Sequence, residues 1–310
     1  MRTRLFGGRG GRFATTRHTV MVLCIGAMIV SLGSSVSGQF APLKTIIIQQ
    51  PMDTSPKPWT GKRLPDGQPD VHGGVWQITD AGNGWLHNPQ VGATNPDADT
   101  YPQKPSRIID PPDGLPPYQP WALARREKQQ TAFLNPVTPE NFDPQGQCLS
   151  GIPKLNYYVS AYTILQSPGY IAFAWEIYHQ YRVIPVDGSP HIGQNIKLWM
   201  GDGRGRWDGN TLTVDTANIN GKARLNIFGD FFSSKAHLTE RFHFLTPDTM
   251  IYEVTIDDPT VFTRPWTMRV NRHVRNPKED EIWEDTCKEN RDYRPSALEI
   301  PGVFVPPTRK

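Results

Sequence analysis

Apolar and polar residues alternate along much of the second half of the chain, from Tyr157 onward. A period of two is typical of β-strands, because successive side chains of a strand point to opposite faces of the sheet. The alternation predicts strands at residues 164–166, 170–177, 181–186, 196–200, 211–216, 238–244, 250–256, 266–274 and 281–287.

Turn-forming sequences separate these segments. The Ser-Pro-Gly of residues 167–169 and the Thr-Pro-Asp of residues 246–248 predict hairpins, and Asp187-Gly188 predicts the end of a strand. The glycine-rich residues 201–205 are expected to form a turn whose arginines are solvated. A phosphate-binding loop is the weaker interpretation of this stretch, because a β-type segment follows it instead of a helix N-terminus.

Many short strands with turns every 8 to 12 residues predict an all-β fold. Consecutive hairpins pair neighbouring strands, so we expect an antiparallel meander closed as a calycin-like or lipocalin-like up-and-down barrel. A β-sandwich is the alternative. The absence of alternating helical segments argues against a parallel α/β sheet.

Residues 39–145 have a different composition. They hold 18 of the chain's 30 prolines, which makes long helices and central strands improbable there. They also hold aromatic residues such as Trp59, Trp76 and Tyr118, which a disordered linker would lack. We therefore expect an extended arm that lays its aromatic side chains on the later domain, with one short helix at residues 120–131.

The first 38 residues combine five arginines, no acidic residue, an apolar run from Val20 to Leu32 and the small residues Val36-Ser37-Gly38. This is the pattern of a secretory signal peptide. A retained membrane anchor is the alternative, but the run is shorter than the roughly 20 residues that span a bilayer. We expect an arm at 39–145, a barrel at 146–295 and a C-terminal tail at 296–310, in a secreted or periplasmic protein without a membrane span after cleavage.

Cleavage changes the charge balance. The whole chain has 33 basic and 30 acidic residues, and removing five arginines leaves 28 against 30, a net charge of −2. The mature chain offers no basic excess for nucleic-acid binding. Its two remaining cysteines, Cys148 and Cys287, favour one disulfide in an oxidising compartment, with free thiols or a metal pair as alternatives.

Several blocks of sequence resemble a broad group of exported bacterial proteins. They include the opening Asp-Gly-Gln-Pro-Asp-Val-His-Gly-Gly-Val-Trp at residues 66–76 and further blocks at 199–201, 205–216, 239–242, 254–259, 263–267 and 287–290. The group has no assigned activity, so the resemblance implies export and homology but no reaction. Its members typically carry a histidine pair where this chain has Gly-Asp-Phe-Phe-Ser-Ser at residues 229–234, so apolar contacts are expected to replace a site built on that pair.

Strand alternation places one carboxylate inside the predicted barrel. Glu240 shares its face with Leu238 and Phe242, and the same parity places Arg272 and Arg182 inward. A buried carboxylate is costly unless it is paired, so Glu240 is expected to meet Arg272 or Arg182. The pair is either a structural contact that fixes the register or a general base in an apolar lumen.

Other candidate chemistry is weaker. Glu176 and His179 have a spacing found in helical metal sites, but in a strand they would point to opposite faces, so a metal is not expected. His179 is expected on the face of Trp175 and Tyr181, where it could act as an acid or base. No partner is identified for His191 or His237. The Asp-Asp-Pro of residues 257–259 lacks calcium-ligand spacing and predicts a turn.

The sequence thus predicts a barrel that binds a small hydrophobic or aromatic molecule, without metal, nucleotide or other cofactor. Any catalysis would be acid/base chemistry of a lyase, isomerase or cyclase type, carried by Glu240, Arg272, Arg182 and His179. A non-catalytic envelope module and a carbohydrate-binding domain are the alternatives. Nothing in the sequence specifies an oligomeric state. Ligand contacts are expected from Trp175, Tyr181, Trp199, Arg206, Phe232 and Trp266.

Overall fold

A computed structural model describes residues 47–79, 86, 105–132, 141, 143–158, 161–226, 228–279 and 281–285. The chain divides into two units, Met1–Gln39 and Phe40–Lys310, and every described residue belongs to the second. The expected signal peptide and C-terminal tail lie outside the described residues, and so does Cys287.

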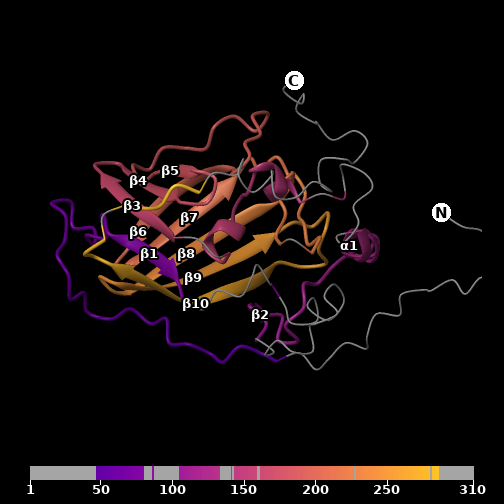
Figure 1. The fold of residues 1–310 in the computed structure, drawn as a ribbon, viewed down its shortest axis with the longest axis horizontal. Coiled ribbons are helices and arrows are strands. Elements are labelled where there is room, and N and C mark those ends of the chain that lie inside the picture. The colour runs from indigo at the N-terminus through magenta and orange to yellow at the C-terminus, as the bar shows by residue number, and fades with distance from the viewer. Residues whose placement is uncertain are drawn as a thin grey trace, which may run out of the picture. The chain divides into compact units, whose positions relative to one another are not determined.

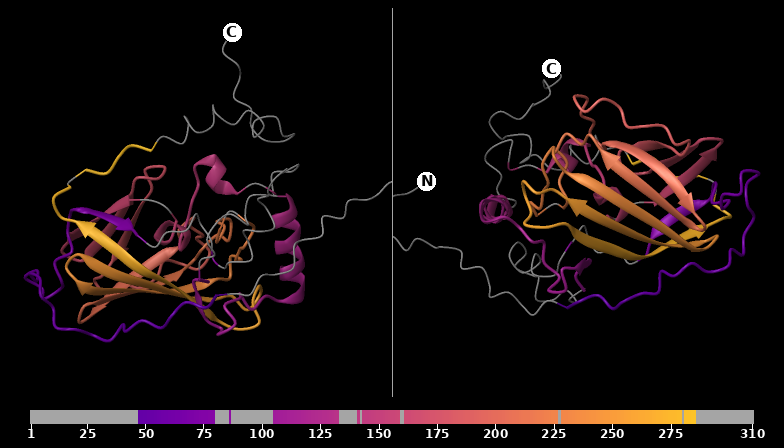
Figure 2. Two further views of the ribbon diagram at one scale, coloured as in Figure 1. Left: turned by 60° about the horizontal axis from the view of Figure 1, so that its bottom comes forward. Right: turned by 180° about the vertical axis from the view of Figure 1, so that it is seen from behind.

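One antiparallel sheet forms the body of the second unit (Figure 1). Its strands follow the order β5-β4-β3-β1-β10-β9-β8-β7-β6, and β2 pairs with β10 beside this path. The sheet curls into a nearly closed barrel, which confirms the predicted fold class (Figure 2). The bounds are β1 Val75–Ile78, β2 Ile108–Asp110, β3 Ala161–Ser167, β4 Tyr170–Trp175, β5 Tyr181–Pro185, β6 Asp202–Asp208, β7 Thr211–Ala217, β8 His237–Thr246, β9 Thr249–Asp257 and β10 Trp266–Asn276.

The hairpins predicted at residues 167–169 and 246–248 are confirmed. Gly169 has a φ of 78° in the turn between β3 and β4, and Gly209 has a φ of 57° in a further hairpin, between β6 and β7. A side chain is strained at such angles, so glycine suits both positions. The turn at residues 246–248 joins β8 to β9, whose register pairs Glu240 with Val254. The predicted helix is also present, as α1 (Pro120–Ala132).

The arm contributes more to the sheet than its prolines predicted. Residues 75–78 form β1, which pairs with β3 on one side and with β10 on the other. The expectation that the arm holds no central strand is therefore wrong. Its proline-free Val-Trp-Gln-Ile sequence supplies the backbone donors that a central strand needs. Trp76 is fully buried, and Trp59 and Tyr118 pack against the core, as expected of an arm that lays its aromatics on the barrel.

Three other predictions about strands are wrong. Residues 201–205 do not form a turn region, because Asp202 begins β6, which pairs with β7 along its whole length. Residues 196–200 contribute only an isolated bridge from Leu198 to Ile219. The described part of 281–287 contributes only a parallel bridge from Asp285 to Ile177. The glycines of residues 201–205 suggested a turn where a strand is present. In residues 196–200 and in the described part of 281–287 the alternation of apolar residues was not sufficient to form a strand.

The barrel closes at a seam between β5 and β6, the two ends of the strand order. Side chains of β5 and the residue after it lie directly on glycines of β6. A Cβ added to Gly203 would stand 2.8 Å from Arg182 Nη2, and one added to Gly205 would stand 2.7 Å from Val186 Cγ1. These glycines therefore allow the two edges to approach each other closely.

Residues 143–158 pack into the core beside the strands. They include two short 3₁₀ helices, Pro144–Gln147 and Lys154–Asn156. The second helix is fully buried, and Lys154 Nζ lies 2.6 Å from Asp143 Oδ2. The second 3₁₀ helix thus brings the polar side chains of Lys154 and Asn156 into the interior of the protein.

Helix α1 stands at one end of the barrel (Figure 2), where Arg126 and Tyr118 both bond Asp230.

Candidate functional site

Glu240 lies in the barrel interior, as its parity predicted. Leu238, Glu240, Phe242 and Phe244 are the buried positions of β8, and the Glu240 side chain is fully enclosed. A lone carboxylate in such surroundings would be strongly disfavoured. Its position therefore depends on the groups that contact its two oxygens.

Four side chains bond the Glu240 carboxylate. Arg182 Nη1 lies 2.7 Å from Oε2, and the Thr216 hydroxyl donates to the same oxygen at 3.0 Å. The Tyr252 hydroxyl donates to Oε1 at 2.9 Å, and Asn156 Nδ2 donates to it at 3.4 Å. Both oxygens are therefore bonded. The predicted contact with Arg182 is confirmed, and we call these five residues the Glu240 cluster.

The charges of the cluster balance inside the barrel. Arg182 is almost fully buried and also donates from Nη2 to Thr216 Oγ1 at 2.6 Å. Burial and the neighbouring Glu240 charge raise the pKa of Tyr252 well above its ordinary value. Tyr252 is therefore a neutral hydrogen-bond donor, and one positive and one negative charge face each other in a low-dielectric interior.

Arg272 does not join the cluster, so its prediction is wrong. Its side chain is exposed, because the register of β10 against β9 shifts between Val270 and His273. Such an irregularity changes which residues face inward. His273 takes the inward position in its place and is fully buried.

His273 forms a second buried polar pair with Tyr162. Its Nδ1 lies 2.7 Å from the Tyr162 hydroxyl, and its ring contacts the rings of Tyr162 and Tyr252. Burial, followed by the charge of Arg107, lowers the pKa of His273 to about 3. The imidazole is therefore neutral at physiological pH, and its Nδ1 shares a hydrogen bond with the tyrosine hydroxyl.

Aromatic rings line the interior next to these polar groups. Phe242 lies 5.0 Å from both Phe173 and Tyr252, measured between ring centroids. Trp175 stacks on Phe173 at 5.7 Å and contacts Tyr162 at 6.2 Å. Ring pairs at these separations contribute favourable packing beyond the area that they bury. The result is an aromatic wall with a charged pair in it.

Some buried polar atoms of this region find no hydrogen-bond partner among the described residues. Three of them are Asn156 Oδ1, Arg182 Nε and Trp175 Nε1. All three side chains are at least nine-tenths buried. Buried polar atoms are nearly always bonded in folded proteins, so such a group calls for an explanation. Two donors and one acceptor thus remain free in the aromatic interior.

The other predicted site residues do not gather at Glu240. His179 is exposed in the turn after β4 with a φ of 51°, and Tyr181 is 70% exposed. Arg206 points outward from β6. The expected interior positions of His179 and Tyr181 are wrong, because the strand ends at Trp175 and the alternation does not continue through the turn. The exposure of Arg206 agrees with the solvated arginines expected in its segment.

The aromatic residues predicted to contact a ligand differ in their burial. Trp175, Phe232 and Trp266 are buried in the core cluster. Trp199 is half-buried, and its Nε1 donates to the Ser150 carbonyl at 2.6 Å. In the segment that differs from the resembling group, Phe231 and Phe232 are buried, as expected of apolar contacts, while Asp230 accepts bonds from Tyr118 and Arg126.

Sequence patterns could have identified part of what was missed. Tyr252 alternates with Met250 and Val254, and Thr216 alternates with Val214, so parity alone places both inward. Asn156 and His273 carry no such signal. The first lies in a 3₁₀ helix and the second follows a register shift.

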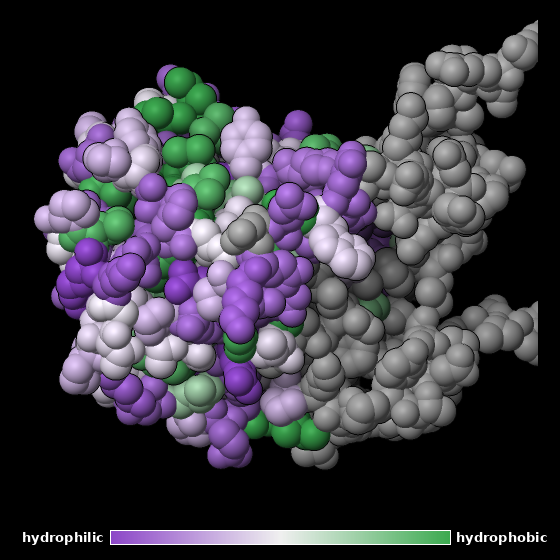
Figure 3. Space-filling view, turned by 60° about the vertical axis from the view of Figure 1, so that its left-hand side comes forward, coloured by the Kyte–Doolittle hydropathy of each residue, from purple (hydrophilic) through white to green (hydrophobic). Residues whose placement is uncertain are grey.

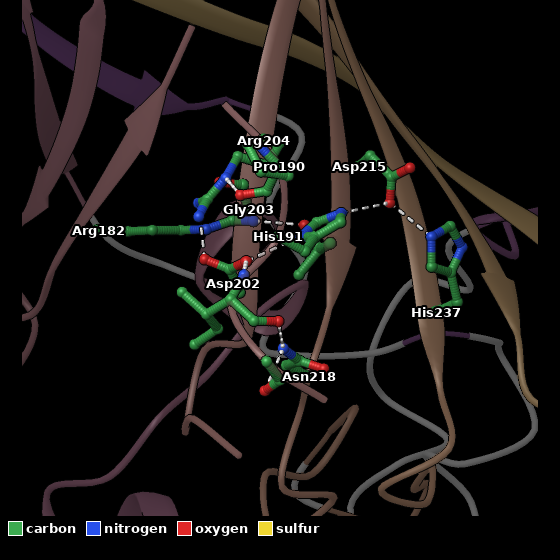
Figure 4. A network of polar contacts seen from close by, with 12 residues as sticks. Arg182, Pro190, His191, Asp202, Gly203, Arg204, Asp215, Asn218 and His237 are labelled. Atoms are coloured by element: carbon green, nitrogen blue, oxygen red, sulfur yellow. Dashed lines mark hydrogen bonds and ion pairs between the residues drawn. The ribbon is translucent and has the colours of Figure 1, made fainter. Parts of the chain in front are cut away.

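A second polar network lies on the outer surface where β6, β7 and β8 run together (Figure 4). His191 Nδ1 lies 2.8 Å from Asp202 Oδ2, and Asp202 Oδ1 lies 2.6 Å from Arg204 Nη1. His191 Nε2 and His237 Nε2 both approach Asp215 Oδ1, at 3.5 and 2.5 Å. These are the partners that the sequence did not identify.

This network holds the β5–β6 connection against the barrel. Burial alone would raise the pKa of Asp202, but hydrogen bonds from the Ile192 amide and from His191 outweigh it, and the pKa is lowered. The carboxylate thus anchors the connection as an anion. Within the described part of the chain, no group of three or more His, Cys, Asp or Glu side chains is arranged to hold a metal ion.

Comparison with known proteins adds no relative, since no family model, curated protein or solved structure matches the chain. No helix in the described ranges is long and apolar enough to cross a bilayer.

Proposed function

We propose that this protein is an exported barrel that binds a small, neutral molecule with an aromatic or apolar body and one polar end. The observation that carries the proposal is the set of free buried polar atoms beside the aromatic wall, namely Asn156 Oδ1, Arg182 Nε and Trp175 Nε1. A ligand with a hydroxyl or carbonyl group would satisfy such atoms, while its ring packed on the wall.

The charge balance supports a neutral ligand. Arg182 is already paired with Glu240 at 2.7 Å, so an anionic ligand would compete with an existing carboxylate, and a cationic one would face Arg182. A neutral polar group avoids the cost of burying a further unpaired charge. The proposal therefore names phenols, aromatic ketones and similar molecules as the class to test.

Metal-free acid/base turnover is the second candidate, and the observation that favours it is a carboxylate within an apolar interior. Glu240 and Tyr252 would carry such chemistry, because the structure places His179 and Arg272 elsewhere. We place binding before turnover, since both Glu240 oxygens already accept hydrogen bonds. The carbohydrate-binding alternative is less well supported, since Trp76, Trp175 and Trp266 are buried instead of forming an exposed row.

Export is part of the proposal. It is supported by the leader-like first 38 residues and the resemblance to exported bacterial proteins, which we also propose as the family. The surroundings of the two cysteines agree with a disulfide. Gln180 donates to the carbonyl of Ser150, two residues after Cys148, and Ile177 in the same turn bridges Asp285, two residues before Cys287.

The test is recovery of a small molecule with the protein. The full chain is expressed with its leader, purified from the periplasmic fraction, and compared by mass spectrometry under native and denaturing conditions. We expect a bound neutral molecule, and a Trp175→Phe variant, which keeps a ring on the aromatic wall but loses the free Nε1 donor, should retain about fivefold less of it, because one hydrogen bond is worth about 1 kcal/mol. Trp121→Phe, the same change at an exposed position on α1, is the matched control.

Two results would contradict binding. One is a protein that carries no small molecule and whose melting temperature is unchanged by a panel of phenols and aromatic ketones. The other is equal loss of ligand in Trp175→Phe and Trp121→Phe. Turnover is separated from binding by Glu240→Gln, which should abolish a reaction while a retained ligand remains detectable.

A further inference from the structure

The outer face of β3, β4 and β5 carries no charge. Its largest side chains are Leu165, Tyr170, Tyr181 and Val183, which are 45%, 46%, 70% and 52% exposed. The remaining outward positions are small or uncharged as well. We call this surface the outer apolar face, and its residues are Ala161, Thr163, Leu165, Ser167, Tyr170, Ala172, Ala174, Tyr181, Val183 and Pro185.

The rest of the barrel surface is different. Outward positions of β6 to β9 include the charged residues Arg204, Asp215, Arg241, Glu253 and Asp257. In Figure 3, apolar side chains gather at the top of the molecule, the part where β3, β4 and β5 lie in Figure 1, and polar side chains cover the middle. A contiguous exposed apolar patch on one part of a protein surface indicates an interaction site.

The strand register arranges the outer apolar face in rows. Leu165, Ala172 and Val183 are neighbours across the three strands, and Thr163, Ala174 and Tyr181 form the next row. The central strand β4 therefore presents alanines between larger side chains on both sides. An extended apolar segment fits such a strip, because its side chains would lie on the alanines between the flanking residues.

The size of the face favours a tethered occupant. Four large side chains at these exposures make a patch on the order of a few hundred Å², which is typical of functional patches on single proteins. A stable complex between separate proteins buries about 800 Å² on each partner. A segment of the same chain needs less area, because tethering supplies an effective concentration in the millimolar range.

The chain itself passes close to this face. Asp285 forms a parallel bridge with Ile177, just after the end of β4, and the Trp283 amide donates to Glu176 Oε1 at 2.8 Å. The sequence after Asp285 contains an uncharged stretch at residues 300–307, Ile-Pro-Gly-Val-Phe-Val-Pro-Pro. The 14 residues between them (286–299) reach up to about 50 Å when extended, which exceeds the roughly 20 Å length of the face.

We propose that residues 300–307 of this chain dock on the outer apolar face and cover Leu165, Tyr170, Tyr181 and Val183. The interaction is intramolecular and is anchored where Asp285 meets Ile177. It goes beyond the proposed ligand binding, because it involves the outside of the barrel and does not require a ligand in the interior.

Hydroxyl-radical footprinting of the full chain tests this proposal. We expect slow oxidation of Tyr170 and Tyr181, and a several-fold rise when Val303→Asp and Phe304→Asp are combined, because charge opposes docking on an apolar surface. Ser296→Asp with Ala297→Asp adds the same charge outside the apolar stretch and should leave both tyrosines protected. Trp121, which is 49% exposed on α1, serves as an internal reference.

Two outcomes would overturn the proposal. In the first, Tyr170 and Tyr181 react equally fast in the unaltered chain and in the Val303→Asp/Phe304→Asp variant. In the second, protection grows with protein concentration together with a dimer mass in light scattering, which assigns the face to a second copy. The substitutions lie outside the described residues. An unchanged melting temperature verifies that each variant is folded.

Discussion

At the scale of single residues, the interior of the barrel combines a charge pair with aromatic packing. Glu240 and Arg182 are both nearly inaccessible, and each depends on the other for compensation of its charge. Replacing one member of a buried pair leaves the other charge unpaired, whereas replacing both with apolar residues can be nearly neutral. The two kinds of variant therefore separate a structural role from a functional one.

We predict that Glu240→Gln lowers the free energy of unfolding by about 3 kcal/mol, because Arg182 then lies buried without a counter-charge. The double variant Glu240→Gln/Arg182→Met should recover much of this loss. Urea unfolding followed by tryptophan fluorescence measures both. Asp110→Asn removes a charge from the exposed pair with Arg264 and should leave the midpoint within error. Additive losses in the double variant would contradict the pairing.

His273 predicts a pH dependence of stability. Its pKa is about 3 in the fold, against an ordinary value of 6.5, so the unfolded chain binds a proton more readily than the native chain between these values. Stability is therefore lost as the pH falls below 6.5, at up to about 1.4 kcal/mol per pH unit from this group. The loss ends near pH 3, where native His273 also protonates.

The corresponding variant is His273→Asn, whose side-chain oxygen can still accept from Tyr162. We expect its free energy of unfolding to depend less steeply on pH between 4 and 6 than that of the unaltered protein, by on the order of 1 kcal/mol per pH unit. His179→Asn alters an exposed imidazole and should keep the original slope. Equal slopes in all three proteins would mean that His273 protonates freely in the fold.

At the scale of elements, the seam between β5 and β6 closes the barrel without a ladder of backbone hydrogen bonds. Arg182 on β5 contacts Thr216 on β7 and Glu240 on β8, so its side chain links one end of the strand order to strands near the other end. Ile184 and Val186 lie on Gly205. At the seam, side-chain packing and the ion pair between Arg182 and Glu240 thus hold the strands together, whereas backbone hydrogen bonds do so between the other strands.

We predict that Gly205→Ala destabilises the protein by about 1–3 kcal/mol, because its new Cβ would stand 2.7 Å from Val186 Cγ1. This corresponds to a fall in the melting temperature of several degrees. Gly193→Ala is the control, since no atom lies within 4 Å of a Cβ there. Calorimetry compares the two variants, and an equal effect of both would show that the seam accommodates the extra group.

At the scale of the whole molecule, the arm and the later segments stabilise the barrel together. Strand β1 of the arm pairs with β10, and Tyr118 bonds Asp230 at 2.7 Å. The predicted disulfide between Cys148 and Cys287 would enclose most of the sheet. One of its partners lies outside the described residues, so the bond stays a prediction.

We expect the mature protein to show no free thiol until it is reduced, and Cys148→Ser to lower the free energy of unfolding by roughly 4–5 kcal/mol. The loop that the bond would close spans 139 residues (287 − 148), which is why the expected effect is large. Alkylation and intact-mass measurement before and after reduction count the thiols. Two free thiols in protein recovered from the periplasm would disprove the bond, and Ser150→Ala is a neighbouring control.

The sequence alone determined the features that depend on local periodicity. Alternation predicted the all-β fold and the inward position of Glu240, and the Ser-Pro-Gly and Thr-Pro-Asp sequences predicted the two hairpins. Helix formers after Pro120 predicted α1. These succeeded because side-chain direction in a strand and backbone angles in a turn are set by neighbouring residues.

Tertiary structure decided what local patterns do not encode. The register shift in β10 exchanged Arg272 for His273, and pairing with β7 made a strand of a glycine-rich segment. Pairing on both sides recruited residues 75–78 as a central strand, and the packing of a 3₁₀ helix brought Asn156 to Glu240. Each depends on partners distant in sequence, whose positions are fixed only when the sheet curls and buries its interior.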